Sequence, residues 1–281
     1  MRGRVSGMAE DTSIEPSAGE TRSKRRWIRS EELTKIILDG AIEVLKKEGL
    51  GLSVENITFK KVFDHITETT GMRITNSSVI GRIWKDQADF QLALILNAAD
   101  GTLDAEFYAT LTPFAGVLEQ TERTSLASRQ DALRELCRLA GAANLDWLTK
   151  SETWPLWIGI WLASISGESS ERRTLLSERM LANYTSHSAA FEMIYVEALD
   201  YLGYRIKEPY TAHQLTDAIM SLADGSAIRV MVDESAIMGI KRPTGPNGKI
   251  EEWNLFSIGL EALVSHFVEP IPRWRPPKED A

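Results

Sequence analysis

The sequence predicts an all-α protein, and three observations support this prediction. Apolar residues recur at intervals of three and four along most of the chain, as they do on one face of a helix. The alternation of apolar and polar residues that is typical of strands is scarce. Breaks rich in glycine, proline and polar residues separate the helical segments. With 281 residues and 43% hydrophobic content, the chain is long enough for one or two domains with their own cores.

The first 29 residues have no helical periodicity. Residues 1–21 are rich in Gly, Ser, Glu and Pro, which predicts a disordered tail. The next eight residues, RSKRRWIR, include five basic residues and no acidic one. Two interpretations of this basic arm remain open. It is a solvated run of charge, or it contacts the phosphates and minor groove of a nucleic acid through residues such as Arg25 and Arg26.

Two helices are predicted next. The first occupies residues 30–51, with Ser30 as a cap and Gly49 and Gly51 as the stop. The second begins after Thr58, a suitable cap, and ends at Gly71. Apolar residues at helical spacing give each helix one inner face. These residues are Leu33, Ile37, Ala41, Val44 and Leu45 in the first helix, and Val62, Phe63 and Ile66 in the second.

A short third helix of about a dozen residues is predicted to end at Trp84, with Thr75 or Asn76 as its cap. Its apolar side would hold the helix against the others through Val79, Ile80, Ile83 and Trp84. Its other side would present Ser77, Ser78 and Arg82 outward. Asp86 can cap a fourth helix that continues to about residue 110.

The rest of the chain is also expected to be helical. The predicted helices lie near residues 87–110, 128–149, 153–166, 169–202, 211–232 and 251–269. The longest break covers residues 233–252. The segment EPIPRWRPPKEDA at the end contains four prolines and is expected to be extended and poorly ordered.

Three segments of the chain resemble the TetR family of bacterial transcriptional regulators. ILDGAIEVLKKEGL resembles the first helix of that family, and ITETTG…SSVIGRIWKDQADFQLALI resembles its helix-turn-helix running into the fourth helix. LTDAIMSLADGSAIRVMVDE resembles its penultimate helix. The likeness extends from about residue 30 to residue 270 and is most specific in its first 65 residues.

The chain departs from the family pattern at three points. The interval between Gly71 and Trp84 is wider than usual, which predicts an enlarged turn. Gly81 stands where a tyrosine often contacts a phosphate. Gln87 stands where a lysine often opens the fourth helix, although Lys85 lies two residues earlier.

The resemblance implies a three-helix, helix-turn-helix DNA-binding domain at residues 30–86 and a helical regulatory and dimerisation domain at residues 87–270. A tail with the basic arm would precede them at residues 1–29, and a Pro-rich tail would follow at residues 271–281. The implied function is that of a homodimeric transcriptional regulator, a repressor, bound to a palindromic operator in double-stranded DNA. A small apolar or aromatic ligand in the second domain would modulate this binding.

Arginine and serine side chains on a recognition helix can grip phosphates or base edges, and a valine can touch a thymine methyl group. The residues expected to contact DNA are Arg25, Arg26, Thr75, Asn76, Ser77, Ser78, Val79, Arg82 and Lys85. Taken without its neighbours, the short helix is better interpreted as a simple connection in an all-α core. The alternative function is therefore a helical ligand-binding or protein-interaction protein whose N-terminal domain has lost DNA binding.

Dimerisation is expected through the last two long helices, which are apolar enough to form a four-helix bundle with a second copy. The residues expected there are Leu215, Ile219, Leu222 and Ala223, with Phe256, Leu260, Leu263 and Phe267. Aromatic residues at helical spacing suggest a ligand pocket, although such a stripe is also typical of an ordinary core. The residues expected to line that pocket are Trp157, Trp161, Tyr184 and Phe191.

Composition and motifs argue against several other classes. The single cysteine, Cys137, rules out an internal disulfide framework and a Cys-rich zinc site. The four histidines show no metal-ligand spacing, and no phosphate loop, nucleophile elbow or HExxH motif occurs, so neither a metal, a cofactor nor an enzymatic activity is expected. No apolar run approaches the length of a membrane span, and no secretory signal is recognisable, which favours a cytoplasmic location. The net charge of −8 leaves room for one basic end.

Overall fold

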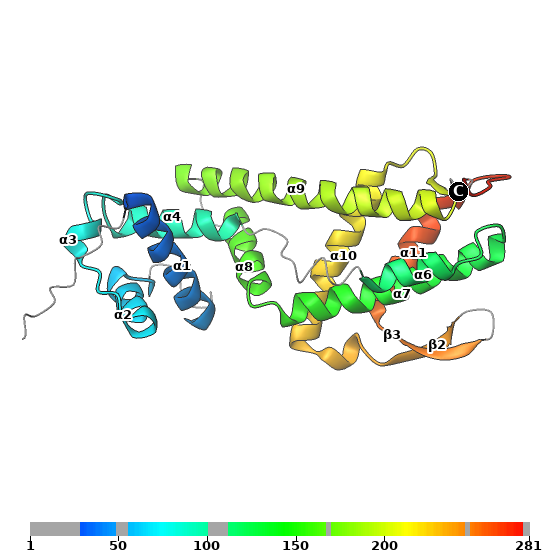
Figure 1. Ribbon diagram of the computed structural model, residues 1–281, viewed down its shortest axis with the longest axis horizontal. Coiled ribbons are helices and arrows are strands. Elements are labelled where there is room, and N and C mark those ends of the chain that lie inside the picture. The colour runs from blue at the N-terminus through cyan, green and yellow to red at the C-terminus, as the bar shows by residue number, and fades with distance from the viewer. Residues whose placement is uncertain (1–28, 49–55, 101–111, 167–169, 245–247, 278–281) are drawn as a thin grey trace, which may run out of the picture.

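The computed structural model describes residues 29–48, 56–100, 112–166, 170–244 and 248–277. This part of the chain is mostly helical, as predicted (Figure 1). The first helices are α1 (Ser30–Glu48), α2 (Phe59–Thr70), α3 (Asn76–Val79), α4 (Gln87–Ala99) and α6 (Thr112–Gln120). They are followed by α7 (Leu126–Lys150), α8 (Trp154–Ile165), α9 (Glu171–Tyr201), α10 (Ala212–Val232), the 3-10 turn η2 (Glu234–Ala236) and α11 (Leu255–Phe267).

Helices α1 to α4 form an N-terminal helical unit at one end of the molecule (Figure 1). Its core contains apolar residues from α1, α2 and α4 together with Trp84, and residues of α8 and α9 such as Ile160 and Met180 complete it. The ring of Phe59 lies 4.6 Å from that of Phe90, and Trp84 meets Phe90 edge-on at 5.1 Å. Helices α1 and α2 pack closely at Gly40, because an added Cβ would lie 2.7 Å from Ile66 Cγ1.

The ends of α2 and α4 confirm the predicted capping residues. The side chain of Thr58 accepts a hydrogen bond from the Lys61 backbone N–H, and Gly71 ends α2 in the left-handed conformation with φ of 73°. The side chain of Asp86 accepts from the Asp89 backbone N–H and starts α4. Helix α4 ends at Ala99, and residues 101–110 of its predicted span lie outside the described residues.

The prediction of a dozen-residue third helix is wrong. Helix α3 has only four residues, Asn76–Val79, and Ile80 is already extended with ψ of 129°. Gly81 has a positive φ of 75°, which favours glycine, and its N–H donates to the Trp84 carbonyl at 2.8 Å. A tight turn therefore replaces the second half of the expected helix.

The rest of the described chain forms a second helical body with its own core. Helix α9 is 31 residues long and runs along the molecule from the side of α4 to the far end (Figure 1). Helices α7, α10 and α11 pack together beside the second half of α9, with buried residues such as Leu145, Ile219 and Phe256 between them. Helices α7 and α11 approach closely at Gly141, because a Cβ there would lie 2.7 Å from Ser257 Cα.

Two small antiparallel sheets lie in segments for which the sequence predicts no strand. Strand β2 (Ile240–Thr244) pairs with β3 (Lys249–Trp253), and β1 (Tyr204–Ile206) pairs with β4 (Val268–Pro270). The helix predicted at residues 251–269 therefore starts later, at Leu255. Trp253 links β3 to β2 through its side chain. Its ring is buried, and its Nε1–H donates to Thr244 Oγ1 at 2.8 Å.

The Pro-rich segment after α11 is packed on the helical body, contrary to the prediction of a poorly ordered end. Trp274 lies beside Gly203, whose missing side chain leaves room for the indole ring. The guanidinium of Arg129 lies 4.8 Å from the ring centroid of Trp274 and donates to the Leu202 carbonyl at 2.8 Å. Residues 278–281 lie outside the described residues.

Helix α6 is not predicted from the sequence, whereas α7, α8, α9 and α10 lie within a few residues of their predicted spans. Within the described ranges, no helix has both the length and the apolar character required to cross a membrane.

Candidate functional site

The segment 71–85, which together with the cap residue Asp86 connects α2 to α4, carries a concentration of positive charge. It contains Arg73, Arg82 and Lys85 and no acidic residue. All three side chains are exposed and form no salt bridge within the described residues. By contrast, Lys35 and Lys60 of the same helical unit are paired with Asp39 and Asp64 at 2.8 and 2.7 Å. The connection therefore offers free cations to an anionic partner.

The start of α3 is exposed and polar. Thr75, Asn76 and Ser77 are exposed, and the hydroxyls of Thr75 and Ser77 lie 3.1 Å apart. Ser78 is partly buried, and its hydroxyl donates to the Thr75 carbonyl at 2.6 Å. Of the residues predicted to contact DNA, Thr75, Asn76, Ser77, Arg82 and Lys85 are therefore accessible, and Ser78 has less freedom.

Two predictions for this connection are corrected. Val79 is fully buried, with 0% of its surface exposed, so it cannot touch a thymine methyl group. Ile80 is 41% exposed and does not hold the unit together, because the chain turns outward after α3. Trp84 is buried, as predicted, and Ile83 packs against the same core. Arg25 and Arg26 lie outside the described residues.

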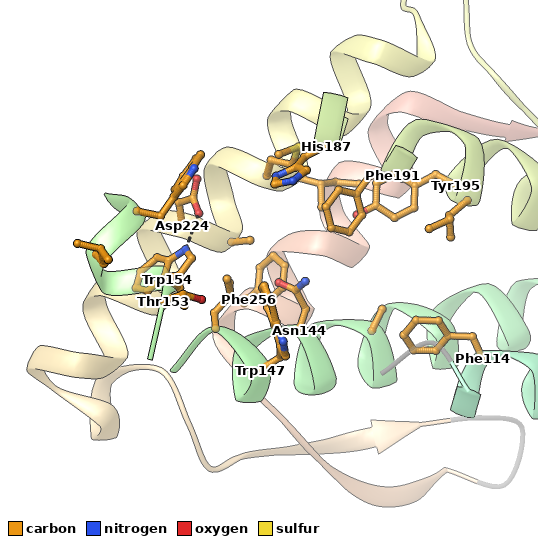
Figure 2. Close-up of a pocket in the computed structure, with 18 of the residues that line it drawn as sticks. Phe114, Asn144, Trp147, Thr153, Trp154, His187, Phe191, Tyr195, Asp224 and Phe256 are labelled. Carbon is orange, nitrogen blue, oxygen red and sulfur yellow. Dashed lines mark hydrogen bonds between the residues drawn. The ribbon is translucent and has the colours of Figure 1, made fainter. Parts of the chain in front are cut away.

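A cavity of about 1290 Å³ lies among the helices of the body and extends to α1 and α2. Figure 2 shows His187, Phe191 and Tyr195 on the wall formed by α9, with Asn144 and Trp147 of α7 facing them across the open space. The volume is larger than the roughly 300–1,000 Å³ that is usual for small-molecule sites, and most of the lining is apolar or aromatic. This arrangement suits a large, mostly apolar molecule.

Asp224 is a partly buried carboxylate on the cavity wall. The Trp154 indole Nε1–H donates to its Oδ1 at 3.3 Å, a hydrogen bond that is marked in Figure 2. Burial raises the pKa of Asp224 to about 6, because a charged carboxylate loses hydration there, and the Trp154 hydrogen bond partly opposes this rise. A group that titrates near neutral pH thus lines the cavity.

Three other titratable groups in the cavity are held in their neutral forms by burial. Burial raises the pKa of the Cys137 thiol to about 12 and raises the pKa of the Tyr195 phenol well above its usual range. Burial also lowers the pKa of His187. A protonated thiol is a poor nucleophile, so Cys137 acts here as a small apolar residue. Within the described residues, no group of His, Cys, Asp and Glu side chains is arranged to hold a metal ion.

Two polar atoms of residues that line the cavity are buried without a hydrogen-bond partner in the described structure. They are the Asn144 side-chain oxygen and the Trp157 indole nitrogen. Leaving such a buried group without a partner costs about 1–3 kcal/mol. A bound molecule with both a donor and an acceptor would reduce that cost.

The predicted ligand residues divide into two pairs. Trp157 and Phe191 line the cavity, as predicted. Trp161 and Tyr184 do not belong to its lining. Their rings pack against each other at 5.2 Å, and Trp161 lies 5.3 Å from Trp157. The aromatic stripe is therefore partly cavity wall and partly ordinary packing.

The residues predicted to form a dimer interface are largely used inside the chain. Leu215, Ile219, Ala223, Phe256 and Leu260 are all buried in the core of the helical body. Leu222, Leu263 and Phe267 are partly buried against the same core. The exposed apolar residues of α10 and α11 are instead Ile228, Met231, Val232 and Leu255.

Asp224, Trp154 and Arg73 are candidate site residues that sequence reasoning missed. An acidic residue inside the apolar segment IMSLADGSAI is a signal that could have drawn attention to Asp224. The absence of acidic residues between Gly71 and Lys85 could likewise have identified Arg73. Nothing local distinguishes Trp154 from Trp161, because only tertiary packing decides which of the two faces the cavity.

Comparisons of the chain with protein-family models, with curated proteins and with solved structures found no match.

Proposed function

We propose that this chain is a homodimeric, DNA-binding transcriptional regulator whose affinity for DNA responds to a small molecule bound in the cavity. The observation that carries the proposal is the basic segment 71–85, which contains no acidic residue and ends just before the cap residue Asp86. It places three cations, which form no salt bridge within the described residues, beside the exposed polar start of α3, on a small helical unit that packs against α8 and α9. Such a surface matches the negative charge and hydrogen-bonding groups of a DNA duplex.

The arrangement of α2, α3 and α4 supports a helix-turn-helix role for this unit. Thr58 and Gly71 fix the ends of α2, and Trp84 fixes the chain before α4. The start of α3 is therefore held on a rigid base, and the N-terminal part of a recognition helix is the part that reaches base edges. Thr75, Asn76 and Ser77 are the side chains that would read sequence there. Arg73, Arg82 and Lys85 would contact phosphates.

The body supplies what a regulatory and dimerisation domain requires. The cavity extends from α10 and α11 to α1 and α2, so a bound molecule would touch both parts of the chain. Dimerisation is assigned to the exposed face of α10, where Ser221, Gly225, Ile228 and Val232 follow one another at helical spacing. A two-fold dimer through this face would present two N-terminal units to a palindromic site.

Selection of bound duplexes from a random pool tests the proposal, because it reports both DNA binding and the symmetry of the site. The decisive variant changes Arg73, Arg82 and Lys85 to alanine. For this variant, the slope of log affinity against log salt concentration should be shallower by about 0.9 for each phosphate that is no longer neutralised. The matched control changes Lys35 and Lys60, which are already paired with acids, and should leave the slope unchanged. Equal slopes in both variants, or selection of no duplex, would refute the proposal.

A second candidate function is supported by the shortness of α3. Four residues expose only one turn of helix to a partner, and Val79 is buried rather than outward. A ligand-binding or protein-interaction protein without DNA affinity would have the same cavity and need no longer recognition helix. This candidate gains if the random pool yields no bound duplex while the cavity binds a small molecule.

A further inference from the structure

The charges that line the cavity are of one sign. Its described lining contains the carboxylates of Asp39, Glu43, Glu197 and Asp224 and no lysine or arginine. Asp39 and Glu43 are paired with Lys35 and Lys46 on α1, at 2.8 and 2.9 Å. Glu197 is exposed on α9. Asp224 is therefore the carboxylate that is both partly buried and, within the described residues, without a salt bridge.

The environment of Asp224 leaves its charge poorly compensated. Its hydrogen-bond donor is the neutral indole N–H of Trp154 at 3.3 Å, which is a long contact for a hydrogen bond. Among the described residues, no cation contributes to the pKa of Asp224, which is raised by burial. A buried carboxylate without a cation is costly to keep ionised, so a positively charged ligand would supply what the protein lacks.

The walls of the cavity favour the same kind of molecule. They include aromatic rings from α7, α8, α9 and α11, among them Trp147, Trp154, Phe191 and Phe256 (Figure 2). Aromatic faces attract cations, and they also bury large apolar groups. An anion would meet four carboxylates in this cavity, and no lysine or arginine of the described lining would offset its charge.

From this geometry we infer that the cavity binds a bulky apolar cation, an aromatic or polycyclic molecule with one ammonium group, whose charge lies beside Asp224. The inference rests on the proposed regulatory role of the cavity and adds the chemical class of its ligand. The apolar part fills the space between Trp147 of α7 and Phe191 of α9, and the ammonium group lies at the Trp154–Asp224 pair. A cavity of about 1290 Å³ accommodates several fused rings.

A pair of isosteric probes tests the charge directly. One is a naphthalene that carries a methylene-linked trimethylammonium group, and the other carries the neutral tert-butyl group in its place. Their shapes match, so a difference in affinity reports the charge. Equilibrium dialysis against the full chain without DNA should show roughly tenfold tighter binding of the cation, equivalent to about 1.4 kcal/mol. Equal binding of the two probes, tighter binding of the neutral probe, or no binding of either would overturn the inference.

Two variants locate the cation. Asp224→Asn removes the charge and keeps an acceptor for Trp154, so the variant should bind both probes with similar affinity. The control is Asp146→Asn, since Asp146 is an exposed residue of α7 outside the cavity lining. It should retain the tenfold preference. Retention of the preference in Asp224→Asn would overturn the placement of the charge. If that variant does not fold, the probe pair on the unmodified chain still decides the ligand class.

The dialysis is independent of DNA, so its failure differs from a failure of the proposed function. A chain that prefers the cationic probe but selects no duplex from a random pool would keep this ligand class and lose the regulatory role. A chain that selects a palindromic duplex but does not distinguish the probes would keep the regulatory role and lose this ligand class.

Discussion

The Trp154 indole donates a hydrogen bond to Asp224 across 70 residues of sequence, and this contact joins α8 to α10. Helix α8 belongs to both cores, because Trp154 packs in the core of the body while Leu156 and Ile160 pack in the core of the N-terminal helical unit. A change at Asp224 therefore acts on a helix that the two parts of the chain share.

The stability of the protein should depend on pH through Asp224. Its pKa is about 6 in the folded chain against an ordinary value of 3.8, so the folded state binds the proton more tightly than the unfolded state. The stabilisation from protonation is fully present below about pH 4 and is lost as the pH rises through about 6. At pH 8, the free energy of unfolding of Asp224→Asn should therefore exceed that of the unmodified chain by on the order of 2 kcal/mol. The variant should accordingly unfold at a higher temperature.

This difference is measured by thermal denaturation of both chains at pH 8 and pH 4. At pH 4 the two side chains are both neutral, so the gap in Tm should nearly close. The comparison between variant and unmodified chain at each pH cancels the titration of other carboxylates. A gap in Tm that does not change with pH would show that burial does not perturb Asp224.

Cation binding should weaken on acidification. A permanent cation such as the trimethylammonium probe does not titrate, so a change in its affinity reports the protein. As the pH falls through about 6, Asp224 takes up a proton and stops attracting the cation. The nearby groups of α9 do not reverse this sign. The pKa of Tyr184 is raised, so its phenol stays neutral, and a proton gained by His187 on acidification would add positive charge that also disfavours the cation. Dialysis at pH 8 and pH 5 measures the effect, and affinity that rises at pH 5 would contradict it.

Trp84→Ala should destabilise the N-terminal helical unit. The ring is 5% exposed and packs against Phe59 and Phe90, at 6.1 and 5.1 Å between ring centroids. Removing so large a buried side chain costs roughly 3–5 kcal/mol. Hydrogen exchange should accelerate in α1, α2 and α4 while α7 and α11 stay protected. The control is Ile80→Ala, four residues earlier and 41% exposed, which should leave exchange in all these helices unchanged.

Some of this architecture could be predicted because its signals are local. Thr58, Gly71 and Asp86 mark helix ends through hydrogen bonds to residues at most four positions away, and the long helices carry their own periodicity. The length of α3 could not be predicted in this way. Asn, Ser and Val allow a helix there, and the turn arises because Gly81 adopts a positive φ while Trp84 enters the core.

The features for which the prediction is wrong depend on contacts between distant segments. The Pro-rich segment has no periodicity, which predicts disorder, yet Trp274 packs on Arg129, 145 positions away in the sequence. The same reason explains the cavity. Trp157 and Trp161 are equivalent in local pattern, but α9 covers one and leaves the other on the cavity wall. Likewise, the periodicity of α10 identifies an apolar face but not whether a second copy or the chain itself covers it.

The exposed face of α10 should form the interface of the proposed dimer. Val232 is 77% exposed and Ile228 is 43% exposed. Apart from the chain neighbours of Gly225 and the backbone of α10, no atom of the described chain lies within 4 Å of the position of a Cβ on Gly225. A double change of Ile228 and Val232 to glutamate would place like charges opposite each other in a two-fold interface, so the chain should sediment as a monomer. Leu181→Glu, at an exposed apolar position of α9, is the control and should remain dimeric. A dimer in both variants would place the interface elsewhere.

Arg82 and Asn76 should make different contributions to DNA binding. Arg82 lies in the turn after α3, exposed and without a salt bridge in the described residues, whereas Asn76 is the first residue of α3. A base-reading side chain belongs near the start of the helix, and a side chain beyond its end meets the phosphate backbone. Arg82→Ala should therefore weaken binding to operator and scrambled duplexes alike and make the salt slope shallower by about 0.9. Asn76→Ala should cost roughly 1–3 kcal/mol of binding free energy on the operator only, with relaxed preference at one base pair in each half-site.

Affinities of both variants on both duplexes at two salt concentrations distinguish the two roles. If Arg82→Ala changes only operator binding, Arg82 reads a base, and if neither variant changes binding to either duplex, the α2–α4 connection does not contact DNA.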